Sequence, residues 1–179
     1  MDAEYRIFSS GEIEVSTVNR VRRDAAFLPR FGFEVELDGS AEYLQYYGKG
    51  PEENYPDICH HVRKGLFEAK IDEDYVEKAF PQEQGNHTET EFLKVENDQG
   101  GILFTSDKNS PFCFRATHHS IDEINRARHY CELQNKEISY LRIDYKVSGV
   151  GSYSLQEKYK FLEKDFNFRF YMKPFAKGK

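Results

Sequence analysis

Six carboxylates in this sequence have the chemistry that glycoside hydrolysis requires. They are Glu52, Glu53, Glu83, Glu89, Glu91 and Asp144. That reaction uses two carboxyl groups about 5 Å apart for retention of configuration, or roughly 6.5 to 9.5 Å apart for inversion. None of the six has a diagnostic context, and the chain contains no GxSxG, P-loop or GxGxxG motif. Solvated surface charges and loop hydrogen-bond acceptors are therefore the simpler interpretation.

Two histidine doublets, His60-His61 and His118-His119, have the side chains of zinc ligands. Adjacent residues of a strand point to opposite faces of the sheet, so neither doublet supplies two ligands to one ion without help from elsewhere. Capping, loop hydrogen bonds or simple exposure explain these histidines equally well. The sequence therefore predicts no metal site.

The charge balance argues against nucleic acid as a partner. Lys and Arg total 25 against 31 Asp and Glu, which gives a net charge of -6, and no run of five or six like charges occurs. No apolar run approaches the roughly 18 residues of a membrane span, and the first ten residues do not resemble a signal peptide. We therefore expect neither a nucleic-acid partner nor a membrane association.

The three cysteines, Cys59, Cys113 and Cys131, show no CxxC spacing. Their odd number fits reduced thiols of a cytoplasmic protein better than a disulfide framework. We expect all three to have structural roles only.

Alternation of apolar and polar residues predicts an antiparallel β protein of sandwich type, with at least eight strands in a single domain spanning 1–179. Phe and Tyr make up 15% of the residues, which suits half-buried sheet surfaces. The predicted strands and hairpins lie within residues 5–21, 30–38, 42–47, 92–107, 111–117, 138–147 and 158–174.

One segment, residues 120–133, has helical rather than strand periodicity. Ser120 can serve as its N-cap, with Glu123 three residues later completing a capping box. Apolar residues then recur at helical spacing as far as Cys131. We expect one short helix here and no other.

Three shaped loops separate these elements. GKGPEENYPD (48–57) combines glycines that permit close backbone approach with prolines that fix φ. FPQEQGNHTET (80–90) carries a Phe-Pro pair, a glycine and several amide and carboxyl groups, and SGVGSYS (148–154) places Tyr153 after two glycines. An aromatic ring on such a loop can lie flat against the apolar face of a sugar, although it can equally cover the edge of the core.

The three loops, in this order and with a helix ending ARHYCEL before LRIDYKVSGVGSYS, resemble one family over most of the chain. They look like the C-terminal domain, also called the small chain or domain 5, of the β-galactosidases of glycoside hydrolase family 2. The stretches YRIFSSGEIEVS and PRFGFEVEL, ahead of the first loop, also match in character and spacing.

The resemblance implies a β-supersandwich similar to that of galactose mutarotases, in a version shortened at its N-terminal side. It also implies that the catalytic glutamates lie on a separate (β/α)8 barrel that this chain does not contain. The expected function is that of an accessory domain or small subunit, which shapes the active-site mouth of an enzyme that hydrolyses terminal β-D-galactosides such as lactose. No residue of this chain would be catalytic.

The family places an aromatic residue on the sugar in the aglycone position, and here that position falls on Tyr153. Many relatives carry tryptophan there and read GVGG-x-x-SW, whereas this chain reads SGVGSYS, so its loop is shorter and its stacking area smaller. In this interpretation the third loop forms a wall at the mouth of the active site. We interpret the other two loops as a rigid structural corner behind that wall, with direct ligand contact as the alternative. The residues of that corner are Gly50, Pro51, Glu53, Asn54, Tyr55, Pro56, Asp57, Phe80, Pro81 and Gly85.

The implied partners are a large chain or domain that bears the barrel, a galactoside substrate and, through the full enzyme, a homo-oligomer. Magnesium and sodium support full enzymes of this family, but no ligand set for either can be assigned in this chain. One alternative is a freestanding carbohydrate-binding module. A second is a small mutarotase-like enzyme, with His87 or His118 as the acid and Glu89 or Asp144 as the base. A third is a degenerate remnant that has lost its partner.

Overall fold

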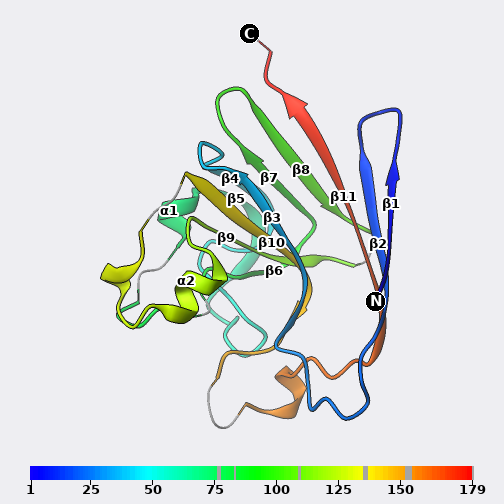
Figure 1. Cartoon of the computed structure of the whole chain (residues 1–179), viewed down its shortest axis with the longest axis vertical. Helices are drawn as coiled ribbons and strands as arrows, with labels where there is room; N and C mark the ends of the chain where they lie inside the picture. Colours follow the sequence, from blue (N-terminus) through cyan, green and yellow to red (C-terminus); the bar gives the residue numbers. More distant parts are fainter. Residues whose placement is uncertain (76–77, 83, 109, 135–136, 152–154, 179) are drawn as a thin grey trace.

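A computed structural model describes residues 1–178 except 76–77, 83, 109, 135–136 and 152–154. Within these residues, the strands form two antiparallel sheets that pack face to face (Figure 1). The predicted all-β antiparallel sandwich is confirmed.

The larger sheet has seven strands in the order β1-β2-β11-β8-β7-β4-β5. Their bounds are β1 Asp2–Ile7, β2 Ile13–Arg20, β4 Tyr43–Gly50, β5 Arg63–Lys70, β7 Phe92–Glu96, β8 Gly100–Ser106 and β11 Asp165–Ala176. The smaller sheet has four strands in the order β3-β10-β9-β6. Their bounds are β3 Arg30–Asp38, β6 His87–Thr90, β9 Phe112–Thr117 and β10 Ile138–Val147.

Aromatic side chains from the two inner faces form the contact between the sheets. Phe33 of β3 lies 5.6 Å from Phe170 of β11, measured between ring centroids. At the other side of the sandwich, the rings of Tyr46 on β4 and Phe114 on β9 are 4.9 Å apart. Burial of each such ring contributes about 1.5 to 3 kcal/mol, so the alternating aromatic pattern both specifies the strand faces and stabilises the packing.

Strand β9 is buried along its whole length, on both faces of its sheet. Its inward residues Phe112, Phe114 and Ala116 belong to the core, to which Ile71 of the neighbouring short helix α1 (Ile71–Asp74) also belongs. On its other face, Cys113 packs with Tyr55 and Val147. Cys113 and Arg115 of this strand are consequently buried. The loops that carry the candidate site therefore rest on a strand that solvent does not reach.

The predicted strands at 30–38, 111–117 and 138–147 and the hairpin at 92–107 are confirmed within one or two residues, and the hairpin at 5–21 is confirmed with β1 beginning three residues earlier, at Asp2. The last strand was predicted to begin at Lys158, which is wrong. Residues Glu157–Tyr159 form a 3-10 turn, and β11 begins only at Asp165. Two strands, β5 and β6, were not predicted, because β5 is rich in Lys and Arg and β6 is only four residues long.

The predicted helix at 120–133 is confirmed only in its first half. The capping box of Ser120 and Glu123 is present, and α2 spans Ile121–Arg126. The chain then becomes extended at Ala127, and Tyr130–Glu132 forms a separate 3-10 turn. Tyr130 donates a backbone hydrogen bond to Ala79, so a tertiary contact replaces the second half of the helix.

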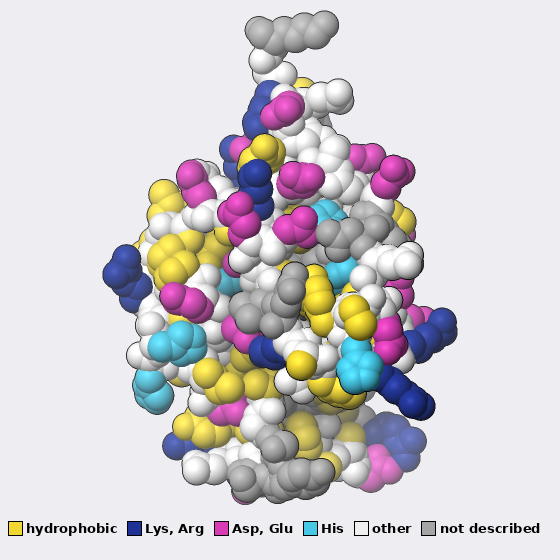
Figure 2. All heavy atoms as spheres, turned by 90° about the vertical axis from the view of Figure 1, so that its left-hand side faces the viewer, with side chains coloured by type: hydrophobic (Ala, Val, Ile, Leu, Met, Phe, Trp, Pro, Cys, Tyr) yellow, Lys and Arg dark blue, Asp and Glu magenta, His cyan; other side chains and the backbone are white. Residues whose placement is uncertain are grey.

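The expectation of a single helix was wrong as well, because the four-residue α1 precedes α2. The first helix has no side-chain cap and is too short to show a helical period, so no pattern in the sequence indicates it. No helix among the described residues is long and apolar enough to cross a membrane. On the face that Figure 2 shows, acidic, basic and histidine side chains are interspersed.

Candidate functional site

The first three residues of the 48–57 segment are the end of β4, which is longer than the predicted strand at 42–47, and the chain turns sharply at Gly50 and Pro51. The hydroxyl of Tyr46 donates to the carbonyl oxygen of Pro51 over 3.2 Å. A Cβ atom at Gly50 would lie 2.3 Å from that hydroxyl, so only glycine permits this approach. The loop is thereby fixed to the core at its first turn.

Asn54 organises the middle of the same loop and is fully buried. Its side-chain amide donates to the carbonyl oxygens of Lys49, at 3.0 Å, and Glu52, at 3.1 Å. Its Oδ1 accepts from the backbone N–H of Thr88, at 3.0 Å, and from the Thr88 hydroxyl, at 2.6 Å. One side chain therefore closes its own turn and binds the 48–57 loop to β6.

Glu53 connects the first loop to the second. Its carboxylate accepts from the backbone N–H of Gly85 at 2.8 Å and pairs with Lys78 at 2.7 Å. Gly85 has φ of +72°, a conformation that favours glycine. Nearby in sequence, Pro81 is buried whereas Phe80 is exposed. The two loops thus form one hydrogen-bonded unit, with the Phe80 side chain left in solvent.

A buried hydrogen-bonded group of three side chains lies beneath this unit. His87 is fully buried, and its Nε2 lies 3.0 Å from both carboxylate oxygens of Asp74. Its Nδ1 lies 3.1 Å from the Tyr46 hydroxyl, and its ring stacks on Phe114 at 4.8 Å. Burial, with the Asp74 carboxylate adding to it, raises the pKa of Tyr46 above its ordinary value. This group joins α1, β6 and β4.

Asp57 connects the first loop to the third. Its Oδ1 accepts from the backbone N–H of Val150 at 3.0 Å, and its Oδ2 from that of Gly151 at 2.7 Å. A Cβ atom at Gly149 would lie 2.5 Å from the Asp57 carboxyl carbon, so the close approach requires glycine there. Asp57 therefore holds a loop that follows it by more than 90 residues in the sequence.

Ser148 fixes the beginning of the third loop from the opposite side. Its hydroxyl donates to the carbonyl oxygen of Leu28 at 2.6 Å and accepts from the backbone N–H of Phe161 at 2.9 Å. The backbone N–H of Gly149 donates to Tyr159 at 2.9 Å. Residues 148–151 are therefore held by segments on both sides and by Asp57.

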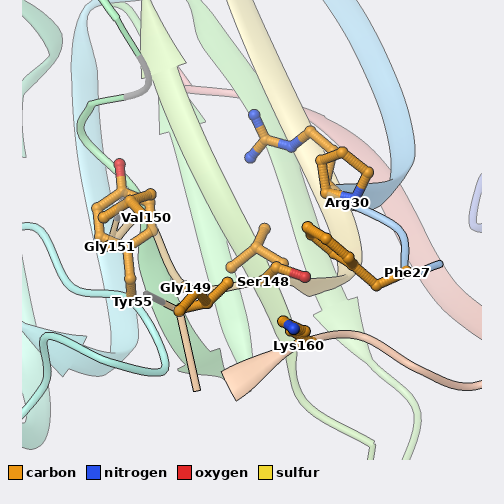
Figure 3. Close-up of a pocket in the computed structure, with 11 residues that line it drawn as sticks. Phe27, Arg30, Tyr55, Ser148, Gly149, Val150, Gly151 and Lys160 are labelled. Atoms are coloured by element: carbon orange, nitrogen blue, oxygen red, sulfur yellow. The ribbon is translucent and has the colours of Figure 1, made fainter. Parts of the chain in front are cut away.

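A cavity of about 480 Å³ lies beside this loop (Figure 3). Tyr55 and Val150 lie on one side of it, and Phe27 and Arg30 on the other. The remaining described lining residues are Pro29, Val147, Ser148, Gly149, Gly151, Leu155 and Lys160. Most of these described residues are apolar side chains or glycines, so the lining suits binding of a largely apolar surface.

Five of the six candidate carboxylates lie among the described residues, and none of these five lines the cavity. Asp144 is buried and pairs with Arg30 at 2.7 Å, and Glu53 holds the first two loops together. Glu89 pairs with Lys49 at 2.6 Å and Glu91 with Lys64 at 2.5 Å. Glu52 is exposed. The remaining two predicted positions, Glu83 and Tyr153, lie outside the described residues.

The histidine doublets are placed in different surroundings. His60 and His61 are exposed, and His61 Nε2 lies 3.1 Å from the carbonyl oxygen of Glu53. His118 and His119 are buried, and His118 Nδ1 lies 3.2 Å from the carbonyl oxygen of Ile138. In the described part of the chain, no group of three or more His, Cys, Asp and Glu side chains could hold a metal ion.

The three cysteines differ in their expected reactivity. Burial, with a smaller contribution from the Asp144 carboxylate, raises the pKa of the Cys113 thiol to about 12, whereas Cys131 is exposed. We expect a thiol reagent at mildly alkaline pH to label Cys131 in the folded protein and Cys113 only after unfolding, as measured by mass spectrometry. Equal labelling rates for both thiols in the folded protein would contradict this.

Comparison with known proteins identifies one family. A family model described as "Beta galactosidase small chain" matches residues 1–172. The chain is 36% identical over 175 residues to a protein named "Beta-galactosidase" from Actinobacillus pleuropneumoniae. It is 37% identical over 147 residues to one from Kluyveromyces lactis and 33% identical over 155 residues to one from Staphylococcus xylosus, both with the same name.

These matches cover most of this chain but a small part of each relative. They include 95%, 79% and 83% of the chain, and 17%, 14% and 15% of the three relatives. The chain therefore corresponds to one segment of much longer proteins.

Proposed function

Because this chain belongs to the beta galactosidase small chain family, we propose that it is an accessory part of a larger β-galactosidase, in which it forms a wall at the mouth of the active site. The large polypeptide would supply the catalytic glutamates and cleave terminal β-D-galactosides such as lactose. The names and lengths of the relatives support this division, since the chain spans 14 to 17% of the proteins it matches.

The observation that carries the wall role is the fixation of the third loop. Asp57 holds the backbone of Val150 and Gly151, while Ser148 holds its beginning. A loop fixed at this many points can present the residue that follows it in a constant position, which is what orientation of a leaving sugar requires. We propose that this residue is Tyr153 and that its ring stacks on the sugar in the aglycone position.

The first two loops act as the structural corner behind the wall, supported by the contacts of Asn54 and Glu53. Residues 1–179 form one domain, supported by a single large hydrophobic cluster that includes residues of both sheets. We also propose that the protein acts in the cytoplasm, which its three free cysteines support. A homo-oligomeric full enzyme is a further part of the proposal, and it follows from the family resemblance alone.

The experiment uses the reconstituted enzyme, made from this chain and the larger polypeptide of the same organism. We expect Tyr153→Ala to raise KM for lactose by roughly two- to twelvefold, since ring stacking contributes about 0.5 to 1.5 kcal/mol. Tyr153→Phe keeps the ring and serves as the matched control, with a KM within about twofold of that of the unchanged enzyme.

The result has a direct bearing on the alternatives. Equal KM values for the unchanged enzyme and Tyr153→Ala would remove Tyr153 from the wall. Saturable binding of lactose to the isolated chain would instead favour a freestanding carbohydrate-binding module, because a wall alone contacts only one side of the sugar.

A further inference from the structure

Strand β1, at the edge of the seven-stranded sheet (Figure 1), has an apolar face that nothing in the described structure covers. Tyr5 is paired with Val15 in the antiparallel register, and Ile7 with Ile13. Directly paired residues lie on the same face of a sheet, and Val15 belongs to the buried core. Tyr5 and Ile7 therefore point to the inner side of the sandwich, yet they are 57% and 78% exposed.

These side chains are exposed because the four-stranded sheet ends before it reaches them. Its edge strand is β3, and in the described part of the chain β3 pairs only with β10. The rings of Phe31 and Phe33 on β3 contact Phe166 and Phe170 of β11. Strand β11 is separated from β1 by β2, so the inner face of the larger sheet extends past the edge of the smaller one.

The partial burial of β3 fits the same geometry. Its inward residues pack against the core but are only partly buried, whereas the inward Leu141 and Ile143 of the neighbouring β10 are fully buried. These four β3 residues are Phe31, Phe33, Val35 and Leu37. The smaller sheet thus ends at β3, whose free edge presents backbone N–H and C=O groups, and beyond this edge the larger sheet continues with the exposed apolar face of β1. We call the free edge of β3 and this face of β1 the step.

We propose that a β-strand of the larger β-galactosidase polypeptide pairs with the free edge of β3 and covers Tyr5 and Ile7. This inference rests on the proposed function, since it names the surface through which the accessory chain meets that polypeptide. Addition of an extended segment to an open sheet edge is a common mode of recognition, in which backbone hydrogen bonds supply affinity and alternate side chains supply specificity.

The outer face of β3 indicates which charge the added partner strand carries. The inward row alternates with Glu34, Glu36 and Asp38, so three carboxylates line the outer face at the free edge. At the other edge of β3, a basic residue of the neighbouring strand already pairs with one of these carboxylates: Arg142 of β10 lies opposite Glu34 and forms an ion pair with it at 3.2 Å. The added strand therefore carries Lys or Arg on its outer face and apolar residues on its inner face.

The same carboxylates disfavour a second copy of this chain as the occupant. Pairing of two β3 edges would place the carboxylates of one copy beside those of the other, and like charges on neighbouring strands are destabilising. The inward apolar side chains of the two copies would be compatible, but their outward carboxylates would repel each other. The step is therefore suited to a basic strand rather than to itself.

The test measures the dissociation constant of this chain for the larger polypeptide by calorimetry. We expect Ile7→Lys and Tyr5→Glu each to raise it by roughly tenfold or more, because each places a charge in a buried apolar contact. Val18→Lys is the matched control, since Val18 lies on the outer face of the neighbouring β2 and is 49% exposed. It should change the dissociation constant by less than about twofold.

A second pair of variants tests the charge argument. Glu36→Lys should weaken binding by roughly fivefold or more, whereas Asp98→Lys at the exposed tip of the β7-β8 hairpin should not. Hydrogen exchange should also show that amides of β3 become protected when the two polypeptides are mixed.

The outcomes separate this inference from the proposed function. Binding that is unaffected by Ile7→Lys and Tyr5→Glu, with β3 exchange unchanged, would overturn the docking surface and leave the proposed function intact. Absence of any binding would overturn both. A homodimer in sedimentation that Ile7→Lys abolishes would show that the occupant is a second copy, against the charge argument.

Discussion

Replacement of His87 with alanine is expected to lower the free energy of unfolding by about 3 to 5 kcal/mol, the usual cost of leaving a buried charge without its partner. Nε2 of His87 lies 3.0 Å from both oxygens of Asp74, whose side chain is only 4% exposed. The loss also removes the ring that stacks on Phe114 and the hydrogen bond to Tyr46. Denaturant unfolding followed by circular dichroism measures the effect.

The matched control is His61→Ala, because His61 is exposed and makes one contact with a carbonyl oxygen. It should change the free energy of unfolding by less than about 1 kcal/mol. A double variant lacking both His87 and Asp74 should be more stable than the sum of the two single losses predicts, since the buried charge disappears with its partner. A loss below about 1 kcal/mol for His87→Ala would show that the buried group does not stabilise the loops.

Replacement of Asp57 with alanine is expected to lower kcat/KM of the reconstituted enzyme by up to about tenfold, as large a loss as that expected for Tyr153→Ala, because a displaced loop no longer holds the Tyr153 ring in position. Two backbone N–H groups, of Val150 and Gly151, lose their acceptor. Stability should fall by only about 1 kcal/mol, because the loop is exposed and water replaces the carboxylate. Initial rates with lactose and a melting curve measure the two effects.

Asp98→Ala is the control for this change, since Asp98 is an exposed carboxylate at a hairpin tip. It should leave both kcat/KM and stability unchanged. Asp57→Asn should give an intermediate activity, because an amide oxygen accepts from one N–H group while its NH₂ group repels the other. Full activity of Asp57→Ala would contradict the positioning role of the third loop.

Much of the fold could be predicted because the strands follow the alternation of apolar residues. In β3, Phe31, Phe33, Val35 and Leu37 all point inward, as their spacing of two predicts. The same rule failed for β5, whose alternate residues are mostly Lys, Arg and small side chains at a sheet edge. It also failed after Ala127, where contacts with residues distant in sequence override the helical period.

The candidate site could be predicted only in part. Glycines and prolines marked the three loops, since their backbone preferences are local. The partners of those loops are not local. Asp57 bonds to Val150 and Gly151, and His87 bonds to Tyr46 and Asp74, and no spacing in the sequence indicates such pairs. The only signal for the first pair was a carboxylate in one rigid loop and glycines in another.

The most direct test of the central claim is the rate of lactose hydrolysis by three samples at equal concentration. These are this chain alone, the larger β-galactosidase polypeptide of the same organism alone, and their mixture. We predict no hydrolysis by this chain alone, and full activity only in the mixture. Hydrolysis by this chain alone would contradict the claim, as would a larger polypeptide whose rate and KM are the same with and without it.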